Sequence, residues 1–181
     1  MNGTRFKLLP SGLQWHASEK PQSAVLVLLC IDQHEPYTLL TRRSPDLLHH
    51  AGQISLPGGK RAIRDVSPEH TALREAEEET GVDARHISTL GRLPALEVSS
   101  GFEIIPVVGT TSANHNLRPQ PGEVDEIIMC PLQLVLDSGN YRTDSLVKNG
   151  VRRDFLALDF EGHYIWGATA RILFSLTEST Q

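Results

Sequence analysis

Four glutamates and one arginine lie within the six positions 74–79, shortly after a glycine-rich stretch. A helix turns once every 3.6 residues, so it would place Glu75, Glu78 and Glu79 on one face. Three carboxylates on one face repel each other unless a cation lies among them, and all-oxygen sites suit hard divalent cations such as Mg²⁺. The alternative is a solvated acidic face on an ordinary surface helix. The arginine, the spacing and the glycine stretch favour a metal platform that handles phosphates.

The residues around this run predict a helix over residues 68–80. Ser67 is a favourable N-cap residue, and Pro68 suits the first helical position. Gly81 fits just beyond the end, as the left-handed residue that stops a helix. The opposite side of this helix is less polar, so one side can pack while the carboxylate side stays in water.

The acidic run matches the second half of a known signature, G-x5-E-x7-R-E-U-x-E-E-x-G-U, where U is a bulky aliphatic residue. The matching residues are Arg74, Glu75, Glu78, Glu79, Gly81 and Val82, with Ala76 as a small version of the first U. This signature is the Nudix box, so the segment resembles the Nudix hydrolases. The first half is displaced, because Gly59 and Asp65 each stand one place early, as if one residue were inserted before the helix. Asp65 is therefore only a possible substitute for the first glutamate.

A second motif lies upstream, and with this offset it resembles the coenzyme A pyrophosphatase subgroup. The subgroup motif is L-L-T-x-R-S-x3-R-x3-G-x3-F-P-G-G, and this chain has LLTRRS at residues 39–44 and GQISLPGG at residues 52–59, at the same spacing. Leu48 replaces the motif arginine and Leu56 the phenylalanine. The missing arginine removes one candidate contact to a phosphate-rich substrate. The resemblance extends over nearly the whole chain.

The resemblance implies metal-dependent hydrolysis of a diphosphate linkage in coenzyme A or its derivatives, giving 3′,5′-ADP and 4′-phosphopantetheine. The expected Mg²⁺ or Mn²⁺ ligands are Glu75, Glu78, Glu79 and the carbonyl group of Gly59 or Gly58. Arg74 is expected to orient one of these glutamates. The candidates for the general base are Glu78 first, then Glu123 and Glu126, which follow a long polar loop. The expected substrate contacts are Arg43, Ser44, His50, Gly52 and Gln53.

Two alternatives stay open. One is a Nudix pyrophosphatase for another nucleoside diphosphate derivative, such as NADH, a dinucleotide or a damaged nucleotide; Leu48 and Leu56 keep it open. The other is a catalytically silent Nudix module that senses a ligand. Such modules usually lose glutamates of the box, whereas this chain keeps three.

Composition restricts the class of protein. A chain of 181 residues, 39% of them hydrophobic, suits one domain with a real core. The formal net charge of −5 argues against non-specific nucleic-acid binding. Only Cys30 and Cys130 are present, which fits a reducing cytoplasm, and no apolar run is long enough to span a bilayer. We expect a cytoplasmic monomer or homodimer that binds a small nucleotide diphosphate, with no nucleic-acid or membrane partner.

Periodicity predicts an α/β protein with a mixed sheet between helices, and the resemblance implies the Nudix α/β/α sandwich. Residues 1–20 are expected to be an N-terminal extension with a short helix, and residues 21–181 a single domain. Strands are expected at residues 24–31, 37–43, 53–56, 86–96, 103–108, 126–130, 151–160 and 164–166. Further helices are expected at 131–136 and 168–176, and a turn at 57–59.

Overall fold

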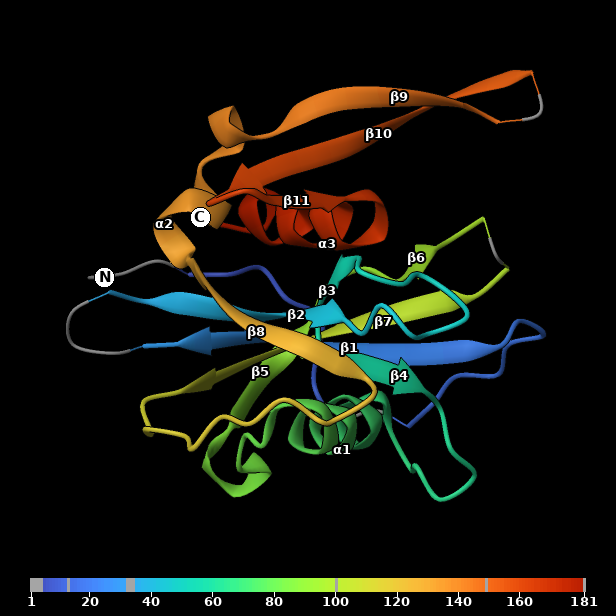
Figure 1. Ribbon diagram of the computed structural model, residues 1–181. Helices are drawn as coiled ribbons and strands as arrows, with labels where there is room; N and C mark the ends of the chain where they lie inside the picture. Colours follow the sequence, from blue (N-terminus) through green and yellow to red (C-terminus); the bar gives the residue numbers. More distant parts are fainter. Residues whose placement is uncertain (1–4, 13, 32–34, 100, 149, 181) are drawn as a thin grey trace.

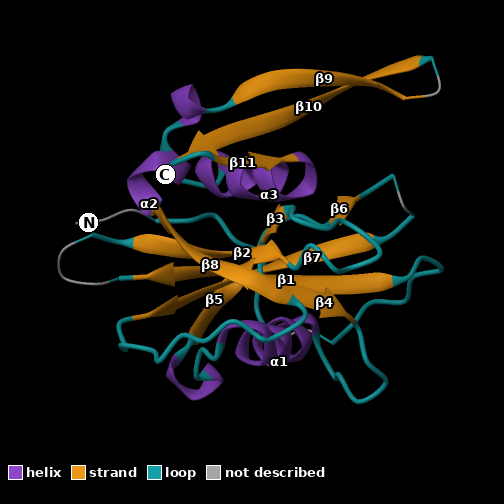
Figure 2. Cartoon of the chain, viewed as in Figure 1, coloured by secondary structure: helices purple, strands orange, loops and turns teal. Residues whose placement is uncertain are grey.

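A computed structural model describes residues 5–12, 14–31, 35–99, 101–148 and 150–180. A main mixed sheet lies between helix α1 (Pro68–Thr80) on one face and helix α3 (Gly167–Glu178) on the other, and a smaller sheet covers the far side of α3 (Figure 1). Figure 2 shows the same layers by type of structure. The predicted α/β/α sandwich is confirmed.

The main sheet comprises eight of the described strands. They are β1 (Gln22–Cys30), β2 (Tyr37–Arg43), β3 (Ile54–Ser55), β4 (Gly58–Lys60), β5 (Ser88–Arg92), β6 (Leu96–Glu97), β7 (Glu103–Thr111) and β8 (Val124–Pro131). Strands β1 and β7 are parallel, and the other pairs in this sheet are antiparallel. Because layers cover both faces, β1 is an almost continuous apolar run.

The smaller sheet has the order β11-β10-β9, with β9 (Arg142–Lys148), β10 (Val151–Phe160) and β11 (His163–Trp166). The short helix α2 (Leu132–Leu136) links β8 toward it, and two 3₁₀ turns lie at Ala84–His86 and Ser138–Asn140. None of the helices in the described ranges is long and apolar enough to cross a membrane.

Two hydrophobic clusters lie on the two faces of the main sheet. Leu40 and Ile128 belong to the cluster that includes α3. Leu39 belongs to the cluster that includes Ala72 and Ala76 of α1. Side chains along a strand alternate between faces, so neighbouring residues of β2 and β8 point into different layers.

Several predicted elements have the predicted bounds, including α1, β2 and β10. Others differ. The predicted turn at residues 57–59 is largely strand β4, which pairs with β1, and the predicted strand 86–96 breaks into β5 and β6. Strand β9 was not predicted; its first four residues are all polar, and it forms by pairing with β10.

The short helix expected within residues 1–20 is absent from residues 5–12 and 14–20. Phe6 and Leu9 instead form isolated bridges with Thr180 and Arg92, and Trp15 is buried against the α1 layer. Tertiary contacts therefore hold this segment extended along the domain.

Candidate active site

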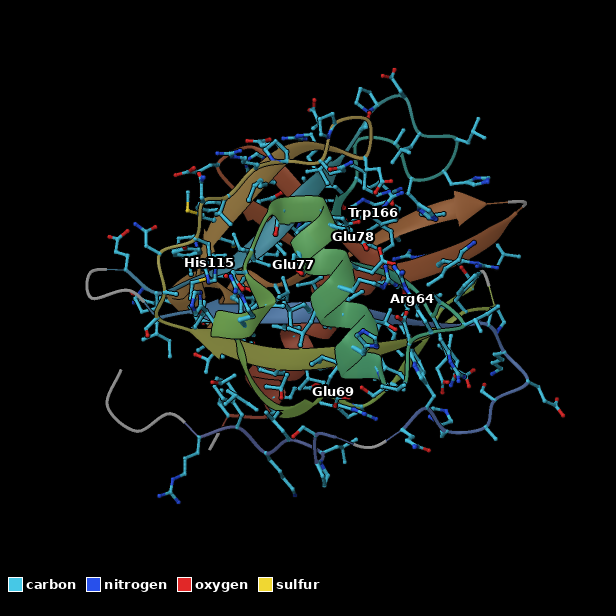
Figure 3. The ribbon with its side chains drawn as sticks, turned by 90° about the horizontal axis from the view of Figure 1, so that it is seen from below. Arg64, Glu69, Glu77, Glu78, His115 and Trp166 are labelled. Carbon is cyan, nitrogen blue, oxygen red and sulfur yellow. The ribbon has the colours of Figure 1, made fainter. Side chains whose placement is uncertain are left out.

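Helix α1 presents its glutamates from a capped and anchored position. The Ser67 hydroxyl accepts a hydrogen bond from the backbone N–H of His70, and Gly81 ends the helix with φ of 72°. Ala72 and Ala76 are buried under the sheet. Glu69, Glu77 and Glu78 lie along the helix in Figure 3, with Glu69 at the opposite end from the other two. The helix thus has one packed face and one face available for chemistry.

The two glycines of β4 lie directly against two of these glutamates. A Cβ atom on Gly59 would stand 2.4 Å from the carboxyl carbon of Glu75, so only glycine leaves room for this carboxylate. The backbone N–H of Gly58 donates a hydrogen bond to Glu79 Oε2 at 3.1 Å. Strand β4 therefore fixes where the carboxylates of Glu75 and Glu79 lie.

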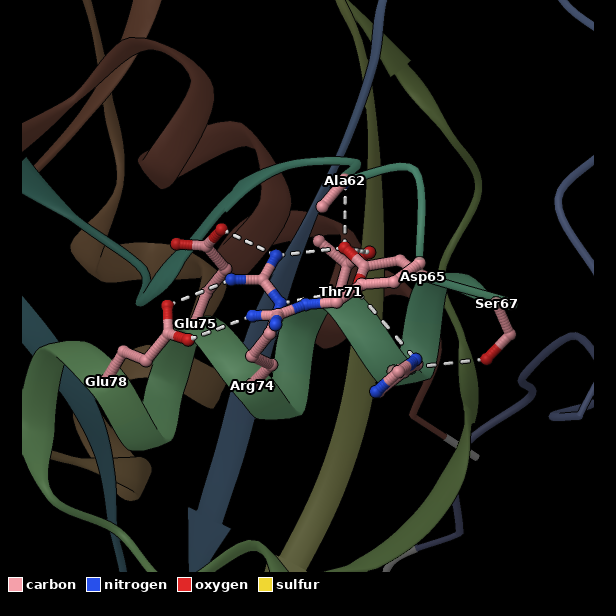
Figure 4. Close-up of polar contacts among 9 residues, drawn as sticks. Ala62, Asp65, Ser67, Thr71, Arg74, Glu75 and Glu78 are labelled. Atoms are coloured by element: carbon pink, nitrogen blue, oxygen red, sulfur yellow. Dashed lines mark hydrogen bonds and ion pairs between the residues drawn. The ribbon is translucent and has the colours of Figure 1, made fainter.

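Arg74 contacts two of the three predicted metal ligands (Figure 4). Its Nη2 lies 2.8 Å from Glu75 Oε1, and its Nη1 donates to Glu78 Oε2 at 2.9 Å. The same guanidinium group forms a third ion pair, with Asp65 at 2.9 Å. The structure thus brings Arg74 to the residues that it is predicted to orient.

The carboxylate of Asp65 is buried and hydrogen-bonded to other groups of the protein. Its side chain is fully buried, and it accepts hydrogen bonds from the Ala62 N–H, the Thr71 hydroxyl and Arg74. The Arg74 guanidinium holds the pKa of this carboxyl group well below its usual range. Asp65 is therefore a support for Arg74. The extra residue before the helix lies in a loop whose Ile63 and Val66 side chains are exposed.

The site favours a cation electrostatically. Burial, with a smaller contribution from the charge of Glu75, raises the pKa of Glu79 to about 7, against the opposing effect of the Gly58 hydrogen bond. Burial also raises the pKa of Glu75, although Arg74 opposes this effect. Both carboxylates are thus short of positive charge in their ionised form.

The ligand set is composed of oxygen atoms, as hard divalent cations require. In the described ranges, however, no three Asp, Glu, His or Cys side chains lie close enough to hold a metal as they stand. Arg74 occupies one oxygen of Glu75 and one of Glu78. A cation can use these residues if their contacts with Arg74 loosen.

Of the two distant glutamates, the structure brings Glu123 to the site but not Glu126. The charge of Glu123 contributes to the raised pKa of both Glu75 and Glu79. Glu126 has the same orientation as Ile128, on the α3 face of the sheet, where it forms an ion pair with Arg42 at 3.0 Å. The reason is that side chains alternate between the two faces of a strand, and the sequence does not show which face of β8 points toward helix α1.

The predicted substrate residues lie in two segments, one at the end of β2 and one on the loop that follows it. Arg43 ends β2 close enough for its charge to lower the pKa of Glu79, and its Nε is buried without a hydrogen-bond partner. The Ser44 N–H donates to the carbonyl group of Glu123 at 2.8 Å. His50 and Gln53 hydrogen-bond to each other at 2.8 Å on a loop in which Gly52 has φ of 69°. Among these predicted residues, Arg43 is the one whose charge acts on a carboxylate of the metal helix.

The loop at residues 112–123 is attached to the end of α1, which sequence reasoning did not specify. The backbone N–H groups of Arg118 and Gln120 donate to the carbonyl groups of Thr80 and Glu79 at 2.8 and 3.0 Å. His115 adds a side-chain anchor, because its Nδ1 accepts the Asp83 N–H at 3.1 Å. In the sequence, only the polarity and the length of this loop indicate a function.

Comparison with known proteins agrees with this geometry. Residues 20–149 match the NUDIX domain. The chain is 38% identical over 175 residues to the uncharacterized Nudix hydrolase NudL of Pectobacterium atrosepticum, covering 96% of this chain and 90% of that protein.

Solved structures share the fold. The Nudix hydrolase RenU of M. smegmatis aligns with a TM-score of 0.54 at 21% identity, over 75% of this chain and 83% of that one. The NUDIX domain of Shewanella oneidensis NrtR, complexed with ADP ribose, aligns with a TM-score of 0.50 at 26% identity, over 66% and 78% of the two chains. Nudix hydrolases generally use divalent metal ions and bind nucleotide derivatives. The chain therefore belongs to the Nudix family and is a Nudix-type pyrophosphohydrolase.

Proposed function

We propose that this pyrophosphohydrolase cleaves the diphosphate linkage of coenzyme A or its derivatives, releasing 3′,5′-ADP and 4′-phosphopantetheine. The observation that supports this most is the continuity of the upstream motif with the metal helix. The motif starts on β2, where Arg43 lies near Glu79, and ends at Gly58 and Gly59, which contact Glu79 and Glu75. We further propose a cytoplasmic monomer or homodimer; Cys30 and Cys130 are both free thiols.

A diphosphate is kinetically inert because its negative oxygens repel a nucleophile. A bound Mg²⁺ or Mn²⁺ would neutralise this charge and lower the pKa of the attacking water. Glu75, Glu78, Glu79 and the Gly59 carbonyl group would hold it. Arg74 orients Glu75 and Glu78, and the Gly58 N–H holds Glu79.

Glu78 is the first candidate for the general base, because its side chain is 51% exposed and can reach water. Glu123 is the second candidate. Arg43, with its unpaired Nε, is proposed to bind a phosphate oxygen beside the reacting centre. Ser44, His50, Gly52 and Gln53 are proposed to contact the rest of the substrate.

The second candidate function is hydrolysis of another nucleoside diphosphate derivative. The ADP ribose bound by the NrtR domain supports it, and so does Leu48, which is 95% exposed and supplies no charge. A competition among coenzyme A, dephospho-coenzyme A and NADH separates the two. Equal or faster turnover of NADH would reject coenzyme A as the preferred substrate.

The decisive experiment incubates the purified protein with coenzyme A and Mg²⁺ or Mn²⁺ and identifies the products by mass spectrometry. We expect both products from the wild type and a loss of at least about a hundredfold in Glu78→Gln. Glu77→Gln is the matched control, because Glu77 is the exposed neighbour on the same helix and makes no contact with Arg74 among the described interactions. Unchanged activity in Glu78→Gln would overturn the assignment of the helix.

A further inference from the structure

A hollow of about 360 Å³ lies where β1 and β7 begin and β4 ends. Its lining includes the cationic side chains Lys20, Lys60 and Arg61, together with Ser18 and Phe102. No carboxylate is among the described residues that line it. Three cations around one concave surface repel each other, and the chain as a whole has a net charge of −5, so this gathering is local.

Aromatic rings hold two of these cations. The ammonium group of Lys60 lies 5.3 Å from the centre of the Phe102 ring, and the guanidinium group of Arg61 lies 5.1 Å from the Trp15 ring. A ring face attracts a cation but carries no net charge, so it orients the group without neutralising it. Arg61 also donates to the neutral Gln22 side chain at 3.4 Å.

The carboxylates nearby compensate little of this charge. Glu97 pairs with Lys20 at 2.6 Å, but the two side chains are 67% and 46% exposed, and such a pair is weak in water. Glu103 has its contacts elsewhere: its Oε2 accepts a hydrogen bond from the Gln22 side chain and lies 2.9 Å from His16 Nε2. Lys60 and Arg61 therefore keep positive charge that is available to a ligand.

We propose that this hollow is an anion site for the phosphate group of a phosphomonoester. A guanidinium fork and ammonium groups suit a phosphate dianion, and the volume exceeds what a phosphate alone requires. Lys60 directly follows Gly59, the residue packed against Glu75. If the proposed function holds, the site binds a substrate phosphate outside the scissile diphosphate, such as the 3′-phosphate of coenzyme A. Its cations would then replace the motif arginine whose position Leu48 occupies.

The first arm of the test titrates inorganic phosphate into the metal-free, ¹⁵N-labelled protein and follows backbone amides by NMR. We expect saturable shifts at Lys60, Arg61 and their neighbours, and their loss in Lys60→Gln/Arg61→Gln. Arg152→Gln removes the same kind of charge at a 71% exposed site on the smaller sheet and serves as the control. Lys60→Gln alone replaces the double variant if that protein does not fold.

The second arm measures kinetics on coenzyme A and dephospho-coenzyme A, which differ only in the 3′-phosphate. In Lys60→Gln/Arg61→Gln, the loss of charge-assisted hydrogen bonds should raise KM for coenzyme A about tenfold or more and leave kcat unchanged. The kinetic constants for dephospho-coenzyme A should not change.

Absence of saturable shifts, or shifts that persist in the variants, overturns the site. Phosphate binding with equal KM changes for both substrates overturns its role in the reaction and leaves a site for free phosphate. If neither substrate is turned over, the proposed function fails, while the phosphate titration still decides the site.

Discussion

Arg74 lies among three carboxylates, and the buried one has a different role from the other two. Asp65 is fully buried and binds the guanidinium group through both oxygens. Glu75 and Glu78 contact it from the exposed side. Asp65 thus fixes Arg74, and Arg74 in turn limits where the two glutamates can move. In this chain an aspartate one place early supports the arginine, because the loop before α1 absorbs the extra residue.

Asp65→Asn keeps the shape of the side chain but removes its charge. We expect the free energy of unfolding to fall by about 2–4 kcal/mol, since one partner of a buried ion pair is lost, and kcat to fall about tenfold because Arg74 is no longer fixed. Urea denaturation and steady-state kinetics measure both. Asp154→Asn, in an exposed pair with Arg152, should cost less than about 1 kcal/mol. Equal losses in the two variants would contradict the role of Asp65.

The raised pKa of Glu79 leads us to expect an unusual dependence of stability on pH. Its folded-state pKa, raised to about 7 by burial, lies above the unfolded value of roughly 4.3. Between these values the folded state binds more protons, so the free energy of unfolding falls as pH rises. We expect the Tm of the metal-free wild type to fall relative to that of Glu79→Gln between roughly pH 4.3 and pH 7. Other groups titrate in both proteins, so the difference isolates Glu79. A constant difference would refute the raised pKa.

At the scale of elements, the loop at residues 112–123 matters most. It is attached to the carbonyl end of α1 through Arg118 and Gln120, and at its far end Ser44 binds the Glu123 carbonyl group. His115 anchors its beginning, since its Nε2 is 3.0 Å from the Thr111 hydroxyl and its Nδ1 accepts the Asp83 N–H. The loop thereby brings Glu123 to the helix carboxylates.

His115→Ala should lower kcat about three- to tenfold by loosening this loop, whereas His115→Asn, which retains an acceptor for the Asp83 N–H, should recover most of the activity. Burial and the nearby His86 lower the pKa of His115, so the ring is neutral at pH 7 and accepts this bond. Kinetics and hydrogen exchange at Gln120 measure the effect. Asn114→Ala, exposed on the same loop, is the control. Unchanged exchange in His115→Ala would show that the backbone contacts suffice.

At the scale of the whole molecule, residues 5–12 and 14–21, which precede β1, belong to the packed structure. Trp15 is 9% exposed and lies in the cluster beneath α1, and Glu69 of α1 accepts the Gly12 N–H while it pairs with Arg92 at 2.6 Å. The segment thus links helix α1, strand β5 and the C-terminal end of the chain. This placement makes the segment part of the scaffold that supports the metal helix.

Trp15→Ala should therefore lower the free energy of unfolding by about 3 kcal/mol or more, because a large buried side chain leaves a cavity. Leu48→Ala, at a 95% exposed leucine, should change it by less than about 0.5 kcal/mol. Chemical denaturation monitored by circular dichroism measures both. A Trp15 variant as stable as the wild type would mean that the segment is dispensable for folding.

The sequence alone determined the local features. Helix α1 follows from Ser67, Pro68 and Gly81, because caps act within a few residues, and strands β2 and β10 follow from short-range patterning. The family resemblance likewise depends on residues that are close in sequence. These features could be predicted because their causes lie within one turn or one strand.

Only the tertiary structure decided the features that depend on distant partners. The extended backbone of Gly58 and Gly59 requires pairing with β1, and the exclusion of Glu126 from the carboxylate face requires the phase of β8 relative to α1. The burial that raises the pKa of Glu79 is likewise contributed by the surrounding fold. Local sequence specifies which groups are present and how each segment bends, whereas long-range packing and burial determine which of them meet and in what state of charge.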